Sequence, residues 1–150
     1  MGVTLLKMGK PGEAYEAFEK ALWVYEQKHG GPPPKEDDKV IDWALTIMHM
    51  GQAKELEAES IVVPANAAID RLDPTVDRLT REAMHEYDRA HQIFGTVEVE
   101  IPDIDIANIM HCKGSLHNVR HEYKKAYQHL RMALNDKIEI LGIDSVSHLR

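Results

Sequence analysis

One spacing of small and large apolar residues recurs along this chain and constrains its fold more than any other feature. An alanine, a large apolar residue four positions later and an alanine three positions after that occur in three segments that can be helical, whereas a fourth occurrence, Ala58, Val62 and Ala65, is interrupted by Pro64. The three sets are Ala14, Phe18 and Ala21; Ala83, Tyr87 and Ala90; and Ala126, Leu130 and Ala133. Such positions share one face of an α-helix, where small residues let a second helix approach and the large residue fills the groove. The spacing predicts helices that pack in pairs.

A second regularity has a period of similar length. Gly9 and Gly51 lie 42 residues apart, and Ala83 and Ala126 lie 43 residues apart. Internal periods of this size indicate stacked units, because a single helical pair cannot bury its apolar face alone. We therefore expect an all-α fold of antiparallel helical hairpins stacked as an α-α superhelix.

Apolar periodicity and helix-breaking residues predict where the helices begin and end. A helix that starts near Pro11 should stop at the glycines and prolines of residues 30–34, because proline cannot continue a helix. The remaining predictions are a helix that ends near Gly51, one that ends at Gly95, and helices over 104–119 and 122–141. Residues 96–105 alternate like a strand but are short and broken by Pro102, so they predict a loop.

The composition supports an all-α fold and limits the kinds of partner that the chain can bind. Aromatic residues make up 6% of the 150 residues, which favours helix over strand. The formal net charge of -7 disfavours nucleic acid and anionic membranes, which bind clustered cations, whereas a basic peptide stays compatible. Cys112 is the single cysteine, so no internal disulfide can form. We expect a soluble cytoplasmic protein.

These residues resemble the tetratricopeptide repeat. Its pattern has a glycine in the first helix, a bend, and then alanine, an aromatic residue and alanine along the second helix. One match comprises Gly2, Gly9, Ala14, Phe18 and Ala21, and the other comprises Gly114, Tyr123, Ala126, Leu130 and Ala133, with His121 in place of the bend glycine. The longer period is similar to the repeats of kinesin light chains, and residues 132–149 are similar to the junction between such repeats.

The resemblance implies units at about residues 1–31, 36–72 in degenerate form and 76–141, with a further unit starting at 142–150. It also implies a protein-interaction module without a cofactor, whose concave face holds a peptide or protein segment. Neighbouring repeats of a longer chain are further candidate partners. The residues expected on the concave face are Asp38, Ile41, Leu45, Met48, His49, Asn108, His111, Ser115 and Asn118.

Two other functions stay open, and enzymatic chemistry finds no support. His117 and His121 are four residues apart on a helix, with His111 and Cys112 nearby, so a regulatory domain with a metal site is the first alternative. A purely structural spacer is the second. The Gly9–Lys10 pair lacks the preceding strand and the hydroxyl residue of a phosphate-binding loop. No serine lies in a nucleophile elbow, so we do not expect an enzyme.

Overall fold

The computed structural model describes residues 2–29, 37–61, 72–95 and 104–141, and this part of the chain contains helices and no strand. The helices are α1 (Gly2–Lys7), α2 (Pro11–His29), α3 (Asp37–Glu59), α4 (Pro74–Gly95), α5 (Ile104–Val119) and α6 (Tyr123–Leu141). The expected all-α class is therefore confirmed within these residues. Of the loop expected at 96–105, residues 96–103 lie outside them, and Ile104 and Asp105 begin α5.

Most helix ends lie where the sequence predicts them, and α3 is the exception. Helix α4 ends at Gly95 and α5 spans Ile104–Val119, as expected. The helix expected to end near Gly51 instead continues to Glu59. Gly51 does not end the helix but packs closely against the Tyr87 ring, and the segment after it is rich in alanine, glutamate and lysine, which favour helix. The prediction of a helix end at Gly51 is wrong.

Two of the bends between helices have the same backbone geometry. After α1, the Gly9 amide donates to the Leu6 carbonyl and the Lys10 amide donates to the Leu5 carbonyl, with Gly9 at φ 73°. After α5, the His121 amide donates to Asn118 and the Glu122 amide to His117, with His121 at φ 61°. Both are Schellman motifs, which satisfy the last carbonyls of a helix. His121 therefore occupies the left-handed position that glycine holds in the first bend.

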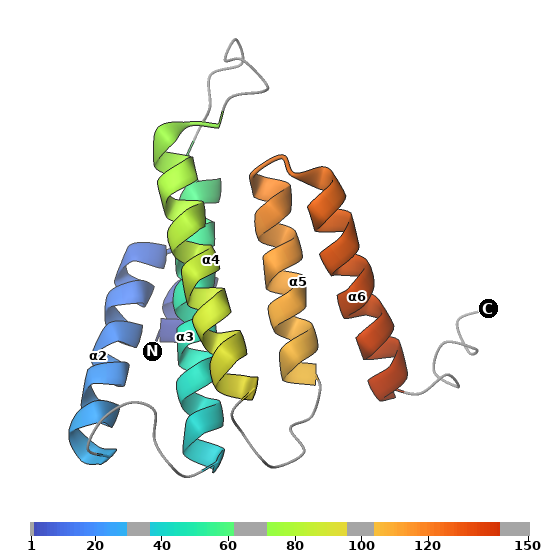
Figure 1. Ribbon diagram of the computed structural model, residues 1–150. Coiled ribbons are helices and arrows are strands. Elements are labelled where there is room, and N and C mark those ends of the chain that lie inside the picture. Colours follow the sequence, from blue (N-terminus) through green and yellow to red (C-terminus); the bar gives the residue numbers. More distant parts are fainter. Residues whose placement is uncertain (1, 30–36, 62–71, 96–103, 142–150) are drawn as a thin grey trace.

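Consecutive helices pair as three hairpins, α1 with α2, α3 with α4, and α5 with α6. Neighbouring hairpins also touch, through α2 against α3 and through α4 against α5. Figure 1 shows the hairpins following one another across the molecule, from α2 at one side to α6 at the other. We call α1, α3 and α5 the first helices and α2, α4 and α6 the second helices.

A glycine on each first helix contacts the large residue on its second helix. A Cβ atom added to Gly2 would lie 2.5 Å from the Phe18 ring, and one added to Gly51 would lie 2.6 Å from the Tyr87 ring. At Gly114 the same atom would lie 2.7 Å from Leu130 Cγ. Each contact is too close for any side chain larger than hydrogen, so glycine sets the distance between the two helices.

Most of the alanines beside these large residues are buried, whereas two residues of the expected packing set, Ala21 and Tyr123, are exposed. Ala14, Ala83, Ala90, Ala126 and Ala133 are at most 3% exposed. Ala21 is exposed, because Gly2 at the start of α1 lies level with Phe18 and α1 does not reach the next turn of α2. Tyr123 is 62% exposed at the start of α6.

The outer face of α6 differs from that of α2 at equivalent positions. Leu22 lies eight residues after Ala14 and is 8% exposed, because α2 packs against α3. Leu134 lies eight residues after Ala126 and is 57% exposed. Tyr127 on the same helix is 63% exposed. Helix α6 therefore presents to solvent a face that α2 buries. Within the described residues, no helix combines the length and apolar character needed to cross a membrane.

Candidate functional site

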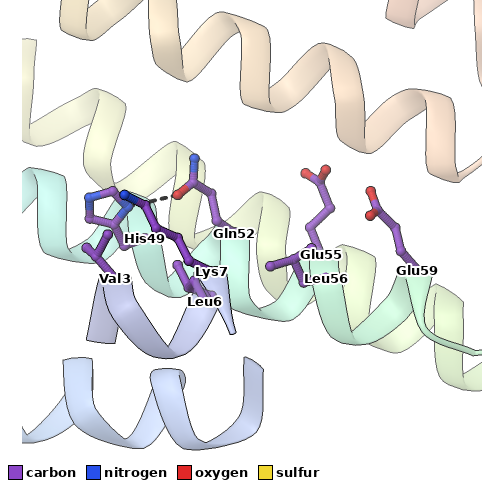
Figure 2. A pocket seen from close by; sticks show the side chains of 8 residues that line it. All are labelled: Val3, Leu6, Lys7, His49, Gln52, Glu55, Leu56 and Glu59. Atoms are coloured by element: carbon purple, nitrogen blue, oxygen red, sulfur yellow. Dashed lines mark hydrogen bonds between the residues drawn. The ribbon is translucent and has the colours of Figure 1, made fainter. Parts of the chain in front are cut away.

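A groove of about 450 Å³ lies between the first helices α1 and α3 (Figure 2). Helix α1 contributes one wall and the second half of α3 contributes the other. The residues that line this groove are Val3, Leu6, Lys7, His49, Gln52, Glu55, Leu56 and Glu59. Its volume falls in the range of sites that hold small ligands or one to two side chains.

The groove has apolar walls that are open to solvent. Val3 is 41% exposed and Leu56 is 37% exposed, and Leu6 lies beside them, partly buried against the core. Apolar surface of this kind gains stability when a ligand covers it, by about 25 cal/mol for each Å² removed from water. The walls therefore suit an apolar side chain.

Glu55 is a buried carboxylate that three helices hold in place at the edge of this groove. It lies on α3 and is 9% exposed. The Tyr87 hydroxyl on α4 donates a hydrogen bond to Oε1 at 3.0 Å, and the Ser115 hydroxyl on α5 donates to Oε2 at 2.8 Å. Each oxygen therefore has one donor, which fixes the orientation of the carboxyl group.

Burial raises the pKa of Glu55 from its usual 4.5 to about 7, since the charged form loses hydration. The hydroxyl donors Ser115 and Tyr87 oppose this shift, and the negative charge of nearby Glu59 adds to it. Among the ion pairs of the described residues, none involves Glu55 or Glu59. The groove therefore holds two carboxyl groups that no cation of the described chain neutralises directly.

A series of polar contacts, separate from those of Glu55, runs from the groove into the core. His49 Nδ1 and Gln52 Oε1 lie 2.8 Å apart, and Gln52 Nε2 donates to Cys112 Sγ at 3.4 Å. The His49 ring stacks on Phe18 with a centroid separation of 5.6 Å. Burial raises the pKa of the Cys112 thiol. Cys112 is thus a packed thiol without the thiolate character that nucleophilic chemistry requires.

The residues expected on the binding face lie in different places. His49 lines the groove, and Ser115 reaches it through its hydrogen bond to Glu55. The others do not line it: Met48 is buried in the core, Ile41 and Leu45 pack partly against the core, Asn108 is half-buried, and His111 and Asn118 are exposed. Asp38 lies in α3, and its side chain is outside the described residues.

Sequence reasoning missed most of the groove residues on α3. Gln52, Glu55 and Glu59 follow His49 at helical spacings of three, six and ten residues. Had the helix been extended past Gly51, each of these residues would have been a surface neighbour of the one three or four positions before it, although Glu55 itself lies about 120° around the helix from His49. The burial of Glu55 has no signal in the sequence, since its partners Tyr87 and Ser115 lie 32 and 60 residues away.

The four residues of the metal alternative do not converge. His117 lies 3.0 Å from Glu122, His121 contacts the Tyr123 hydroxyl, and Cys112 accepts from Gln52. His111 is exposed. In the part of the chain that the structure describes, no three or more histidine, cysteine, aspartate or glutamate residues are arranged to hold a metal ion.

Comparisons with known proteins identify no relative for this chain. No protein-family model matches the sequence, and neither the curated proteins nor the solved structures give a significant match.

Proposed function

We propose that this chain is a protein-interaction module that binds a peptide or protein segment in the groove between α1 and α3. The observation that carries this proposal is the position of the groove, which two first helices of successive hairpins line together. Arrays of stacked hairpins use such surfaces for binding, because the first helices of neighbouring units form a continuous face. The exposed apolar walls and adjacent polar groups supply the contacts that a bound segment needs.

The repeated packing geometry supports an array of the tetratricopeptide type, similar to kinesin light chain repeats. Gly2 contacts Phe18 and Gly114 contacts Leu130, and each pair is separated by 16 residues. In these two hairpins the residue with left-handed φ lies seven residues after the packing glycine: Gly9 follows Gly2, and His121 follows Gly114. In the middle hairpin, Gly51 contacts Tyr87 across a longer connection. One packing rule thus accounts for all three pairs. The single cysteine, which cannot form an internal disulfide, supports a cytoplasmic location.

Selection from a displayed library of random 12-residue peptides tests this function. We expect enrichment of peptides with an apolar residue, and we expect Leu56→Glu to weaken their binding at least tenfold by placing a charge in the apolar wall. Val24→Glu is the matched control, because Val24 is 44% exposed on α2 and lies outside the groove. If no peptide is enriched, or if both variants bind as well as the wild-type chain, the groove is not a binding site and the structural-spacer alternative is favoured.

A further inference from the structure

The groove has an acidic end that the peptide-binding proposal leaves unexplained. Glu55 and Glu59 lie four residues apart on α3, and Figure 2 shows both carboxyl groups projecting to the same side of the helix. Residues at this spacing are neighbours on a helix surface. Glu59 is exposed and close enough to Glu55 for the two side chains to interact by hydrogen bonding. The two carboxyl groups therefore form one site.

We propose that the groove selects segments that carry a lysine or arginine, whose cationic group binds at Glu55 and Glu59 while an adjacent apolar side chain packs on Leu6 and Leu56. This inference rests on the proposed function and names the chemistry of its ligand. The lining of the groove combines these four residues within one hollow.

Free acceptor capacity at Glu55 supports the choice of a cation. A carboxylate offers about four lone-pair sites, and the hydroxyls of Tyr87 and Ser115 occupy two of them. The remaining sites suit the several N–H donors of an ammonium or guanidinium group, which form strong charge-assisted hydrogen bonds with carboxylates. Because Tyr87 and Ser115 hold Glu55 in one orientation, a ligand does not have to order it.

The charges around Glu55 are complementary to a cation. On α3 it is flanked by His49, Gln52 and Glu59, whereas the groups that face it from α4 and α5 are Tyr87, Ser115 and Cys112. Lys7 of α1 is the one lysine or arginine in the described lining. In Figure 2 its side chain extends toward His49 rather than toward the two glutamates. The net charge of -7 adds a long-range attraction for basic segments.

The same environment predicts how binding depends on pH. A cation favours the charged form of a carboxyl group, so a bound lysine or arginine should lower the pKa of Glu55 from about 7. Binding then releases a proton when the free protein starts with Glu55 protonated. We expect the affinity for a cationic peptide to rise as the pH increases from 6 to 8, the interval in which free Glu55 loses its proton.

The test uses synthetic peptides from the library selection, each made with its lysine or arginine and again with methionine at that position. For the wild-type chain we expect the methionine version to bind at least tenfold more weakly. Glu55→Gln and, separately, the exposed Glu59→Gln should reduce this preference to within about threefold. Glu59→Gln keeps the test valid if Glu55→Gln does not fold. Glu57→Gln is the control, because Glu57 lies on α3 outside the groove lining.

A second readout is the ¹³C chemical shift of the Glu55 carboxyl group, followed as a function of pH. Its midpoint should move to lower pH when the cationic peptide binds and should stay unchanged with the methionine version. If groove peptides bind equally well without lysine or arginine, the inference is wrong while the proposed function stands. If no peptide binds the groove, both are wrong.

Discussion

Replacing Gly51 with alanine should destabilise the protein, although alanine is the better helix former. Gly51 lies inside α3, where alanine ordinarily adds about 1 kcal/mol to helix stability. Here the added Cβ would lie 2.6 Å from Tyr87 Cε1 and 3.2 Å from the Ala83 carbonyl oxygen. The Tyr87 ring is fully buried, and its hydroxyl is bonded to Glu55, so the ring cannot move away easily.

The expected magnitude follows from the difference between these two effects. Forcing a methyl group into a well-packed site costs about 1–3 kcal/mol, and a rigid ring with a backbone oxygen places Gly51 near the upper end. After subtracting about 1 kcal/mol for helix propensity, the net destabilisation is about 2 kcal/mol. With a urea dependence of about 2 kcal/mol per molar, the unfolding midpoint should fall by about 1 M.

Urea unfolding followed by far-ultraviolet circular dichroism measures this shift. Gly12→Ala is the matched control, because Gly12 lies in α2 with no atom within 4 Å of an added Cβ. It should leave stability unchanged or raise it by up to about 1 kcal/mol. A Gly51→Ala variant as stable as the wild-type chain would refute the view that glycine sets the distance between paired helices. Gly114→Ala offers a second case, whose penalty should shrink in a Leu130→Ala background.

Three further predictions test other parts of the account. Leu22→Ala should lower the free energy of unfolding by about 2–4 kcal/mol in urea titrations, whereas Leu134→Ala at the equivalent position of α6 should change it by less than about 0.5 kcal/mol; equal effects would contradict the packing described. His121→Gly should raise the melting temperature, because left-handed φ strains a non-glycine residue by about 1 kcal/mol. The greater flexibility of glycine in the unfolded chain offsets part of this gain. A lower melting temperature would show that the ring contact of His121 with Tyr123 contributes more to stability than the strain removes. The pKa of Glu55 is raised from 4.5 to about 7 in the folded state, so the folded state binds the proton more tightly and stability should fall as the pH rises from 5 to 7, by about 2 kcal/mol from this group alone. Glu55→Gln should remove this decline, and an unchanged pH dependence in the variant would assign it to other groups.

The helix pairing was accessible from the sequence because its signals are local. The alanines that flank Phe18, Tyr87 and Leu130 mark one face of each second helix, and in the structure each of these large residues packs closely against a glycine of the preceding helix. The end of α4 and the start of α5 were predictable for the same reason, since Gly95 and the segment after it interrupt the apolar period. Local periodicity was therefore sufficient for the class and for most of the elements.

Gly51 and Glu55 show where local reasoning stops. A glycine that ends a helix and a glycine that permits close packing look alike in sequence, and the residue that decides between them, Tyr87, lies 36 positions away. Glutamate is normally exposed, so the burial of Glu55 depends on donors that two other helices supply. Because α3 was expected to end near Gly51, the groove residues after it were also missed. The site depends on contacts between distant segments, whereas the fold class does not.

Mapping a bound peptide onto the chain by NMR would show whether it binds between the first helices α1 and α3. Backbone amide shifts of the ¹⁵N-labelled protein would be recorded while a library-selected peptide is added. The account predicts that the largest changes lie in Gly2–Lys7 of α1 and in the second half of α3, from His49 to Glu59, where the two first helices line the groove. Changes confined to the second helices α2, α4 and α6 would contradict it and would place the binding surface elsewhere.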